Sequence, residues 1–145
     1  IKPLLEEIAQ RMKQAYSTHI KITGDNLSIL SDEAKLKQLL FIFLDNAKKY
    51  SEQPIDVEIV TGAVVQIRIT DYGVGIPQDD LPHLFDRFYR VDKTRNRQTG
   101  GTGLGLSIAK QLAQLLAIKI DMTSTVGVGT TVTLSFTERG VDDAT

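Results

Sequence analysis

The stretch Gly100-Gly101-Thr102-Gly103-Leu104-Gly105-Leu106 decides how the rest of this 145-residue chain is interpreted. A helix is predicted to follow it, because residues 104–116 are apolar at helical spacing. Unhindered backbone N–H groups and the positive end of a helix dipole would then converge where phosphate oxygens can bind. The spacing is neither GxGxxG nor GxxxxGK followed by Ser or Thr, so it predicts neither a Rossmann unit nor a P-loop. A flexible hinge before a helix is the alternative, and the alternating glycines favour the phosphate site.

Helical and strand patterns alternate along the chain. Apolar spacing predicts helices over residues 3–16, 31–50 and 104–116, and Ser31-Asp32 offers an N-cap for the second. Alternating or β-branched runs predict a hairpin of 20–23 with 27–30, an antiparallel pair of 55–61 with 64–70, and strands at 119–123 and 130–136. This order indicates an α+β fold of two layers, with the helices over one face of a sheet.

Residues 76–101 form a long connection with short apolar pieces among prolines and many charges, and we predict that it is a lid. Within it, residues 84–99 hold five basic residues against two acidic ones, a local net charge of +3. The basic residues are Arg87, Arg90, Lys93, Arg95 and Arg97. A segment that closes over a polyphosphate gains from such charges, although a solvated loop is the commoner explanation for most of them.

The composition limits the remaining classes of function. A net charge of −1 and a pI near 6.1 do not favour a nucleic-acid partner. The absence of cysteine and the presence of only two histidines exclude a thiolate or zinc site, so a metal would be bound by oxygen. No run approaches the roughly 18 apolar residues of a bilayer span. The chain starts in a helical pattern without a methionine, which predicts a piece of a longer protein.

Two further groups of polar residues suggest a ligand. On the second helix Ile42, Asn46 and Lys49 fall within about 60° of one another. A carboxamide oxygen suits Mg²⁺ and an ammonium group one turn on suits phosphate, yet taken alone Asn46 and Lys49 would be interpreted as facing water. The run Asp71-Tyr72-Gly73-Val74-Gly75 ends a strand with a carboxylate that could accept a hydrogen bond from an amino group. In isolation this run is better explained as an ordinary glycine turn.

The order of these motifs resembles the ATP-binding domain of bacterial sensor histidine kinases. The matching motifs are Asn-Ala-x-Lys-Tyr from Asn46, Asp-x-Gly-x-Gly-Ile-Pro from Asp71, the aromatic and basic residues 85–90, Gly-Thr-Gly-Leu-Gly-Leu from Gly101, and Gly-x-Gly-Thr from Gly127. The resemblance implies the Bergerat-type two-layer α/β sandwich with a mixed sheet, three main helices on one face and a long ATP lid. It covers residues 1–137, and residues 138–145 are expected to form a flexible tail.

The resemblance also implies a role for each matching residue. Asn46 would bind Mg²⁺, Lys49 would reach a phosphate, and Arg90 would lie near the γ-phosphate, these three being the candidate catalytic residues. Asp71 would accept from the adenine amino group, with Thr130 supporting the base through water. The remaining expected nucleotide contacts are Tyr50, Gly73, Gly75, Ile76, Gly101, Thr102, Gly103, Leu104, Gly105 and Leu106.

Ile42 departs from the family pattern. The family usually has asparagine at this position, one turn before the residue that binds Mg²⁺. We therefore expect fewer contacts to the metal or the phosphates here. Related ATPases of gyrase, chaperone and mismatch-repair type carry a glutamate base there. Ile42 cannot abstract a proton, which disfavours hydrolysis and favours transfer of the phosphoryl group to an acceptor supplied elsewhere.

We therefore predict a domain that binds Mg·ATP and donates its γ-phosphate to a histidine on a separate dimerisation domain of the same protein. Neither His19 nor His83 lies in a phosphoacceptor motif, so these residues alone are expected to bind nucleotide without autophosphorylation. Two alternatives stay open: a degenerate nucleotide-sensing or protein-interaction module, and a serine kinase of the anti-sigma type.

The resemblance implies partners and a location as well. A response regulator would receive the phosphoryl group, and neither nucleic acid nor direct membrane contact is expected for these residues. The piece would be monomeric, within a homodimeric cytoplasmic sensor that is anchored in the bacterial cell membrane.

Overall fold

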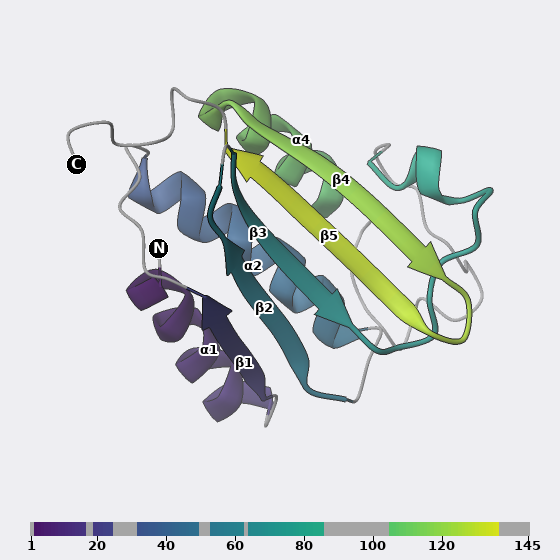
Figure 1. Cartoon of the computed structure of the whole chain (residues 1–145), viewed down its shortest axis with the longest axis horizontal. Helices are drawn as coiled ribbons and strands as arrows, with labels where there is room; N and C mark the ends of the chain where they lie inside the picture. The colour runs from purple at the N-terminus through teal and green to yellow at the C-terminus, as the bar shows by residue number, and fades with distance from the viewer. Residues whose placement is uncertain are drawn as a thin grey trace.

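The computed structural model describes residues 2–16, 19–24, 32–49, 53–62, 64–85 and 105–136. Its elements, in chain order, are α1 (Lys2–Tyr16), β1 (Ile20–Gly24), α2 (Glu33–Lys49), β2 (Ile55–Val60), β3 (Val65–Asp71), the 3-10 helix η1 (Leu81–His83), α4 (Gly105–Leu116), β4 (Ile118–Thr125) and β5 (Gly129–Phe136) (Figure 1). The predicted strand at 27–30, and with it the hairpin, lies outside the described residues, as does the predicted lid from residue 86 onward.

The strands form one mixed sheet in the order β1-β2-β3-β5-β4. β1 pairs with β2 in parallel, and the other neighbours are antiparallel. The predicted antiparallel pairing of β2 with β3 is therefore confirmed, and β4 and β5 form where strands were predicted. In Figure 1 the helices α1, α2 and α4 lie behind the sheet, which confirms the α+β fold with the main helices over one face.

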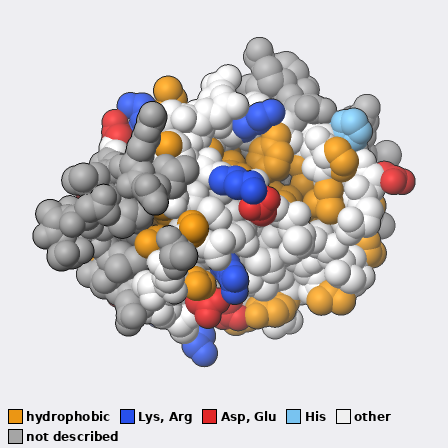
Figure 2. All heavy atoms as spheres, turned by 45° about the horizontal axis from the view of Figure 1, so that its top comes forward, with side chains coloured by type: hydrophobic (Ala, Val, Ile, Leu, Met, Phe, Trp, Pro, Cys, Tyr) orange, Lys and Arg blue, Asp and Glu red, His pale blue; other side chains and the backbone are white. Residues whose placement is uncertain are grey.

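The hydrophobic core lies between the helices and the inner face of the sheet. Every second side chain of β2 and β3 is buried there, as the period of a half-buried strand requires. The opposite face of the sheet is largely polar, and Figure 2 shows basic and acidic side chains interspersed on one side of the molecule. The helices contribute apolar stripes at helical spacing, and the stripe of α2 consists of Leu36, Leu39, Leu40, Phe43, Leu44 and Ala47.

Helix α2 begins where the sequence predicts. The Asp32 carboxylate accepts a hydrogen bond from the Lys35 backbone N–H at 3.1 Å, and the Asp32 carbonyl accepts from Leu36 N–H at 2.9 Å. This is the geometry of an N-cap, which satisfies a backbone donor that the first turn of a helix leaves free. The cap fixes the start of the helix that carries Asn46.

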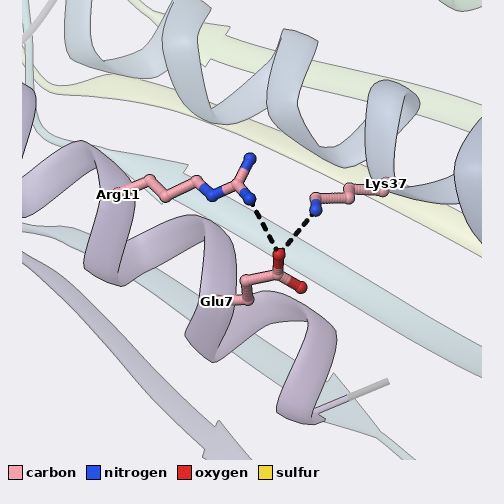
Figure 3. A network of polar contacts seen from close by, with 3 residues as sticks. All are labelled: Glu7, Arg11 and Lys37. Atoms are coloured by element: carbon pink, nitrogen blue, oxygen red, sulfur yellow. Dashed lines mark hydrogen bonds and ion pairs between the residues drawn. The ribbon is translucent and has the colours of Figure 1, made fainter.

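A surface network connects α1 with α2 (Figure 3). Lys37 on α2 donates to the Glu7 carboxylate at 2.6 Å, and Arg11 lies 3.2 Å from the same oxygen. The hydrogen bond from Lys37 holds the pKa of Glu7 below its ordinary value. Because these side chains are partly to largely exposed, the network contributes less to stability than the buried stripe beneath it.

Candidate functional site

Asp71, the last residue of β3, is a buried carboxylate with 6% of its surface exposed. Its side chain points to the inner face of the sheet, and its Oδ1 accepts the Gly73 backbone N–H at 3.0 Å. Burial raises the pKa of Asp71, while backbone N–H groups of Gly73 and Thr130 act in the opposite direction. A buried carboxylate of this kind is a candidate for ligand recognition, because its remaining lone pairs need donors.

Gly129 brings Thr130 beside Asp71. Asp71 and Thr130 are paired across β3 and β5, and both are buried. Gly129 has φ +145°, and a Cβ added to it would lie 2.1 Å from the backbone oxygen of Asp71. Only glycine therefore allows β5 to start this close to the end of β3.

Gly75 brings the loop after β3 against the turn between β4 and β5. A Cβ at Gly75 would lie 2.3 Å from the Thr125 carbonyl oxygen, and the residue has φ +77°. The Gly127 N–H donates to the Val74 carbonyl at 2.8 Å across the same contact. These contacts fix the loop that leads to the buried Ile76.

Ser124 on β4 is a site residue that the sequence motifs did not single out. Its Oγ accepts the Ile76 N–H at 2.7 Å and donates to the Gly129 carbonyl at 3.0 Å. It also lies 2.7 Å from Thr130 Oγ1. One signal was available in the sequence: the predicted strand 119–123 ends one residue before Ser124, and extending its alternation by one position places this hydroxyl on the inner face.

Asn46 and the start of α4 form the other part of the predicted site. Asn46 is half-buried on α2, one turn after Ile42, which is partly buried against the core. Ile42 Cγ2 lies 4.0 Å from the position of a Cβ at Gly105, the first residue of α4. Figure 1 shows the last turns of α2, the first turn of α4 and the end of β3 at one end of the sheet.

The structure describes part of the predicted nucleotide contacts. Asp71, Gly73, Gly75, Ile76 and Thr130 lie together at the end of β3. Asn46 and Gly105 both lie near Ile42, Leu106 is partly buried against the core, and Lys49 ends α2. The predicted residues outside the described ranges are Tyr50, Arg90, Gly101, Thr102, Gly103 and Leu104.

A cavity of about 190 Å³ borders the same end of the sheet. Its lining comes from the ends of β3, β4 and β5 and includes Asp71 and Thr130. Thr70 and Thr131, whose hydroxyls lie 3.2 Å apart, belong to the outward positions of their strands and line it as well. No residue of α2 or α4 borders the cavity. It therefore lies at the end of the sheet, where residues with inward side chains, such as Asp71 and Thr130, and residues with outward side chains, such as Thr70 and Thr131, both border it.

Neither a cluster of acidic or imidazole metal ligands nor a membrane-spanning helix occurs in the described ranges. No group of three or more His, Cys, Asp or Glu side chains there could hold a metal ion. None of the helices that the structure describes is long and apolar enough to cross a membrane.

Residues 31–140 match the sequence profile of the family described as histidine kinase-, DNA gyrase B- and HSP90-like ATPases. The chain belongs to this family. It is 47% identical over 135 residues to the sensor histidine kinase YkoH of Bacillus subtilis, a match that covers 91% of this chain and 30% of YkoH. It is 44% identical over 124 residues to the signal transduction histidine-protein kinase ArlS of Staphylococcus epidermidis, covering 83% of this chain and 27% of ArlS.

Solved structures show the same fold. The mycobacterial sensor histidine kinase MprB superposes with a TM-score of 0.79 at 22% identity, over 97% of this chain and 94% of that one. Full-length ShkA, crystallised in complex with AMPPNP, gives a TM-score of 0.79 at 26% identity, over 99% of this chain and 30% of ShkA. The resemblance to the ATP-binding domain of sensor histidine kinases is confirmed. The chain spans less than a third of YkoH and of ArlS.

Proposed function

We propose that this ATPase-family domain binds Mg·ATP and donates the γ-phosphate to a histidine on a dimerisation domain of the same protein. The observation that carries the proposal is the buried Asp71–Thr130 pair, which faces the helix layer at the end of the sheet where α4 begins. Asp71 would accept from the amino group of adenine. The phosphates would then extend towards the N-terminus of α4, where backbone N–H groups and the helix dipole favour anions.

Asn46 fits the proposed magnesium site. It is half-buried on α2, one turn after Ile42, whose side chain lies 4.0 Å from the position of a Cβ at Gly105, the first residue of α4. Mg²⁺ accepts a carboxamide oxygen and takes its other ligands from phosphates and water, so one protein ligand is sufficient. The bound ion would neutralise charge on the phosphate oxygens during transfer. Lys49 and Arg90 are proposed to contact the phosphates as well.

Ile42 favours transfer of the γ-phosphate to an acceptor group over its hydrolysis by water. Its side chain is apolar and packs between the core and the first residue of α4, so it supplies no general base for water. The proposed reaction instead forms a bond from an imidazole nitrogen to the γ-phosphorus while the bond to the bridging oxygen of ADP breaks. The phosphoryl group would pass on to a response regulator, within a homodimeric sensor anchored in the membrane.

Nucleotide binding is tested by titrating the 145-residue chain with a fluorescent ATP analogue, with and without Mg²⁺. We expect saturable binding that Mg²⁺ strengthens. The Asn46→Ala variant should lose the effect of Mg²⁺ more than it loses affinity for the metal-free nucleotide. A chain that shows no saturable binding would instead be a protein-interaction module.

Phosphoryl transfer is tested by adding the dimerisation domain of the full-length protein to this chain with labelled ATP. We expect an acid-labile, alkali-stable phosphoryl group on the added domain and none on this chain alone. An acid-stable phosphoserine would indicate a serine kinase, and no labelling of an intact acceptor would contradict the proposed transfer.

Substitution of Asp71 by asparagine tests the adenine contact. The amide nitrogen places donors where the amino group of adenine needs an acceptor, so we expect ATP affinity to fall on the order of tenfold to a hundredfold, as for loss of a hydrogen bond to a charged group. The matched control is Asp121→Asn, because Asp121 is exposed on the outer face of β4. Equal ATP affinities for the two variants would show that Asp71 does not contact the nucleotide.

A further inference from the structure

The Ser124 hydroxyl has its full set of hydrogen bonds within the protein. It contacts the Ile76 N–H at 2.7 Å, the Gly129 carbonyl at 3.0 Å and Thr130 Oγ1 at 2.7 Å. A serine hydroxyl offers one proton and two lone pairs. Three bonds at these distances therefore use its whole capacity.

The partners of Ser124 fix the direction of each bond. The Ile76 N–H can only donate, so it takes one lone pair of Ser124. The Gly129 carbonyl can only accept, so it takes the single proton of Ser124. In the third bond Ser124 can therefore only accept, and Thr130 must be the donor.

This assignment leaves Thr130 with lone pairs and no proton for a ligand. Thr130 is buried and paired with Asp71 across β3 and β5. The ionised carboxylate of Asp71 is also an acceptor without a proton to give. Both polar side chains at this point of the inner face then present acceptors only.

We propose that Ser124 is a positioning residue that holds the Thr130 hydroxyl as an acceptor and thereby makes the site select purines with a 6-amino group over those with a 6-oxo group. The inference rests on the proposed function, in which the base lies at Asp71. A 6-amino group donates to acceptors directly or through a water. A 6-oxo group is itself an acceptor, and it meets no donor on these two side chains unless the Thr130 hydroxyl can turn.

Removal of the Ser124 hydroxyl distinguishes two roles for it: orienting the Thr130 hydroxyl, and holding the loop at Ile76 in place. In Ser124→Ala the Thr130 proton loses its partner and becomes available to a 6-oxo group. The Ile76 N–H also loses its partner, which would weaken binding of every nucleotide that contacts this loop. If Ser124 only holds the loop in place, the substitution lowers the affinities for ATP and ITP by the same factor. If Ser124 orients the Thr130 hydroxyl, the substitution changes the ratio of the two affinities.

The test measures dissociation constants of ATP and ITP by displacement of a fluorescent ATP analogue from the 145-residue chain. We expect the wild type to prefer ATP and Ser124→Ala to lower that preference about threefold to tenfold, the effect of one hydrogen bond. Thr131→Val is the matched control, because its hydroxyl contacts Thr70 on the outer face, and it should keep the wild-type ratio. An unchanged ratio in Ser124→Ala would overturn the proposal.

A second pair of variants tests the same claim if Ser124→Ala does not fold. Thr130→Ser retains the hydroxyl and should keep the preference for ATP, while Thr130→Val removes it and should lower the preference. Equal ratios in the two Thr130 variants would overturn the proposal. Absence of ATP binding by the wild type would instead contradict the proposed function, and a wild type that binds both nucleotides equally would overturn only the role of Ser124.

Discussion

The buried carboxylate of Asp71, the proposed adenine contact, lowers the stability of the folded protein when it is ionised. Burial raises its pKa above the ordinary value of 3.8, so the folded protein holds this proton more tightly than the unfolded chain. Between the unfolded and the folded pKa the native state binds more protons, and stability therefore falls as pH rises. The contribution of Asp71 is fully favourable below the unfolded pKa and is lost as pH rises through the folded pKa.

Asp71→Asn should remove this cost because asparagine is neutral at every pH of the experiment. We expect the free energy of unfolding of the variant, minus that of the wild type, to increase from about pH 4 upward and to level off above the folded pKa of Asp71. Urea denaturation of the ligand-free chain at a series of pH values measures this difference. A difference that is constant, or largest at acid pH, would contradict the raised pKa of Asp71.

Site residues differ in how far the sequence alone could predict them. The position of Asp71 at the end of a strand is confirmed, and its proposed role was predicted from the order of the motifs, although its local pattern is also typical of an ordinary turn. The role of Ser124 depends on Ile76, Gly129 and Thr130, which only the sheet brings together. Its inward position follows from the alternation only when the predicted strand 119–123 is extended by one residue, and its partners do not follow from the sequence pattern at all. The roles of all the predicted site residues, Asp71 and Asn46 as much as Lys49, Tyr50 and Arg90, stay predictions.

The same contrast holds for whole elements. Helix α2 is predictable because its apolar period and its N-cap are local features of the sequence. The parallel pairing of β1 with β2 joins Ile20 to Ile55, and no local pattern specifies a partner so far along the chain. Local periodicity thus predicts elements, while the order of strands depends on burial of faces that meet only in the folded molecule.

The N-cap of α2 offers a test at the scale of an element. Asp32→Ala removes the acceptor of the Lys35 N–H, so we expect a loss of about 1 kcal/mol, seen as a lower urea midpoint of unfolding with an unchanged m value. Asp32→Asn keeps an oxygen at the cap and loses only the exposed ion pair with Lys35, so it should stay close to the wild type. If both variants lost the same stability, the ion pair rather than the cap would be responsible.

The core of the molecule extends beyond the range that matches the family. The match covers residues 31–140, yet α1 and β1 precede it. Leu5, Ile8 and Met12 of α1 are each at most 2% exposed and belong to the same hydrophobic cluster as α2 and the sheet. β1 extends the sheet by parallel pairing with β2. The first helix is therefore expected to stabilise the whole domain rather than to form a separate linker.

Ile8→Ala tests whether α1 is part of the folding unit. The substitution leaves a cavity between α1 and the rest of the core, so we expect the free energy of unfolding to fall by about 2–4 kcal/mol. Gln10→Ala, at an exposed position of the same helix, should change it by less than about 0.5 kcal/mol. Urea denaturation measures both free energies. If Ile8→Ala were no more destabilising than Gln10→Ala, α1 would pack as a dispensable appendage, and residues 31–140 alone would hold the stability of the domain.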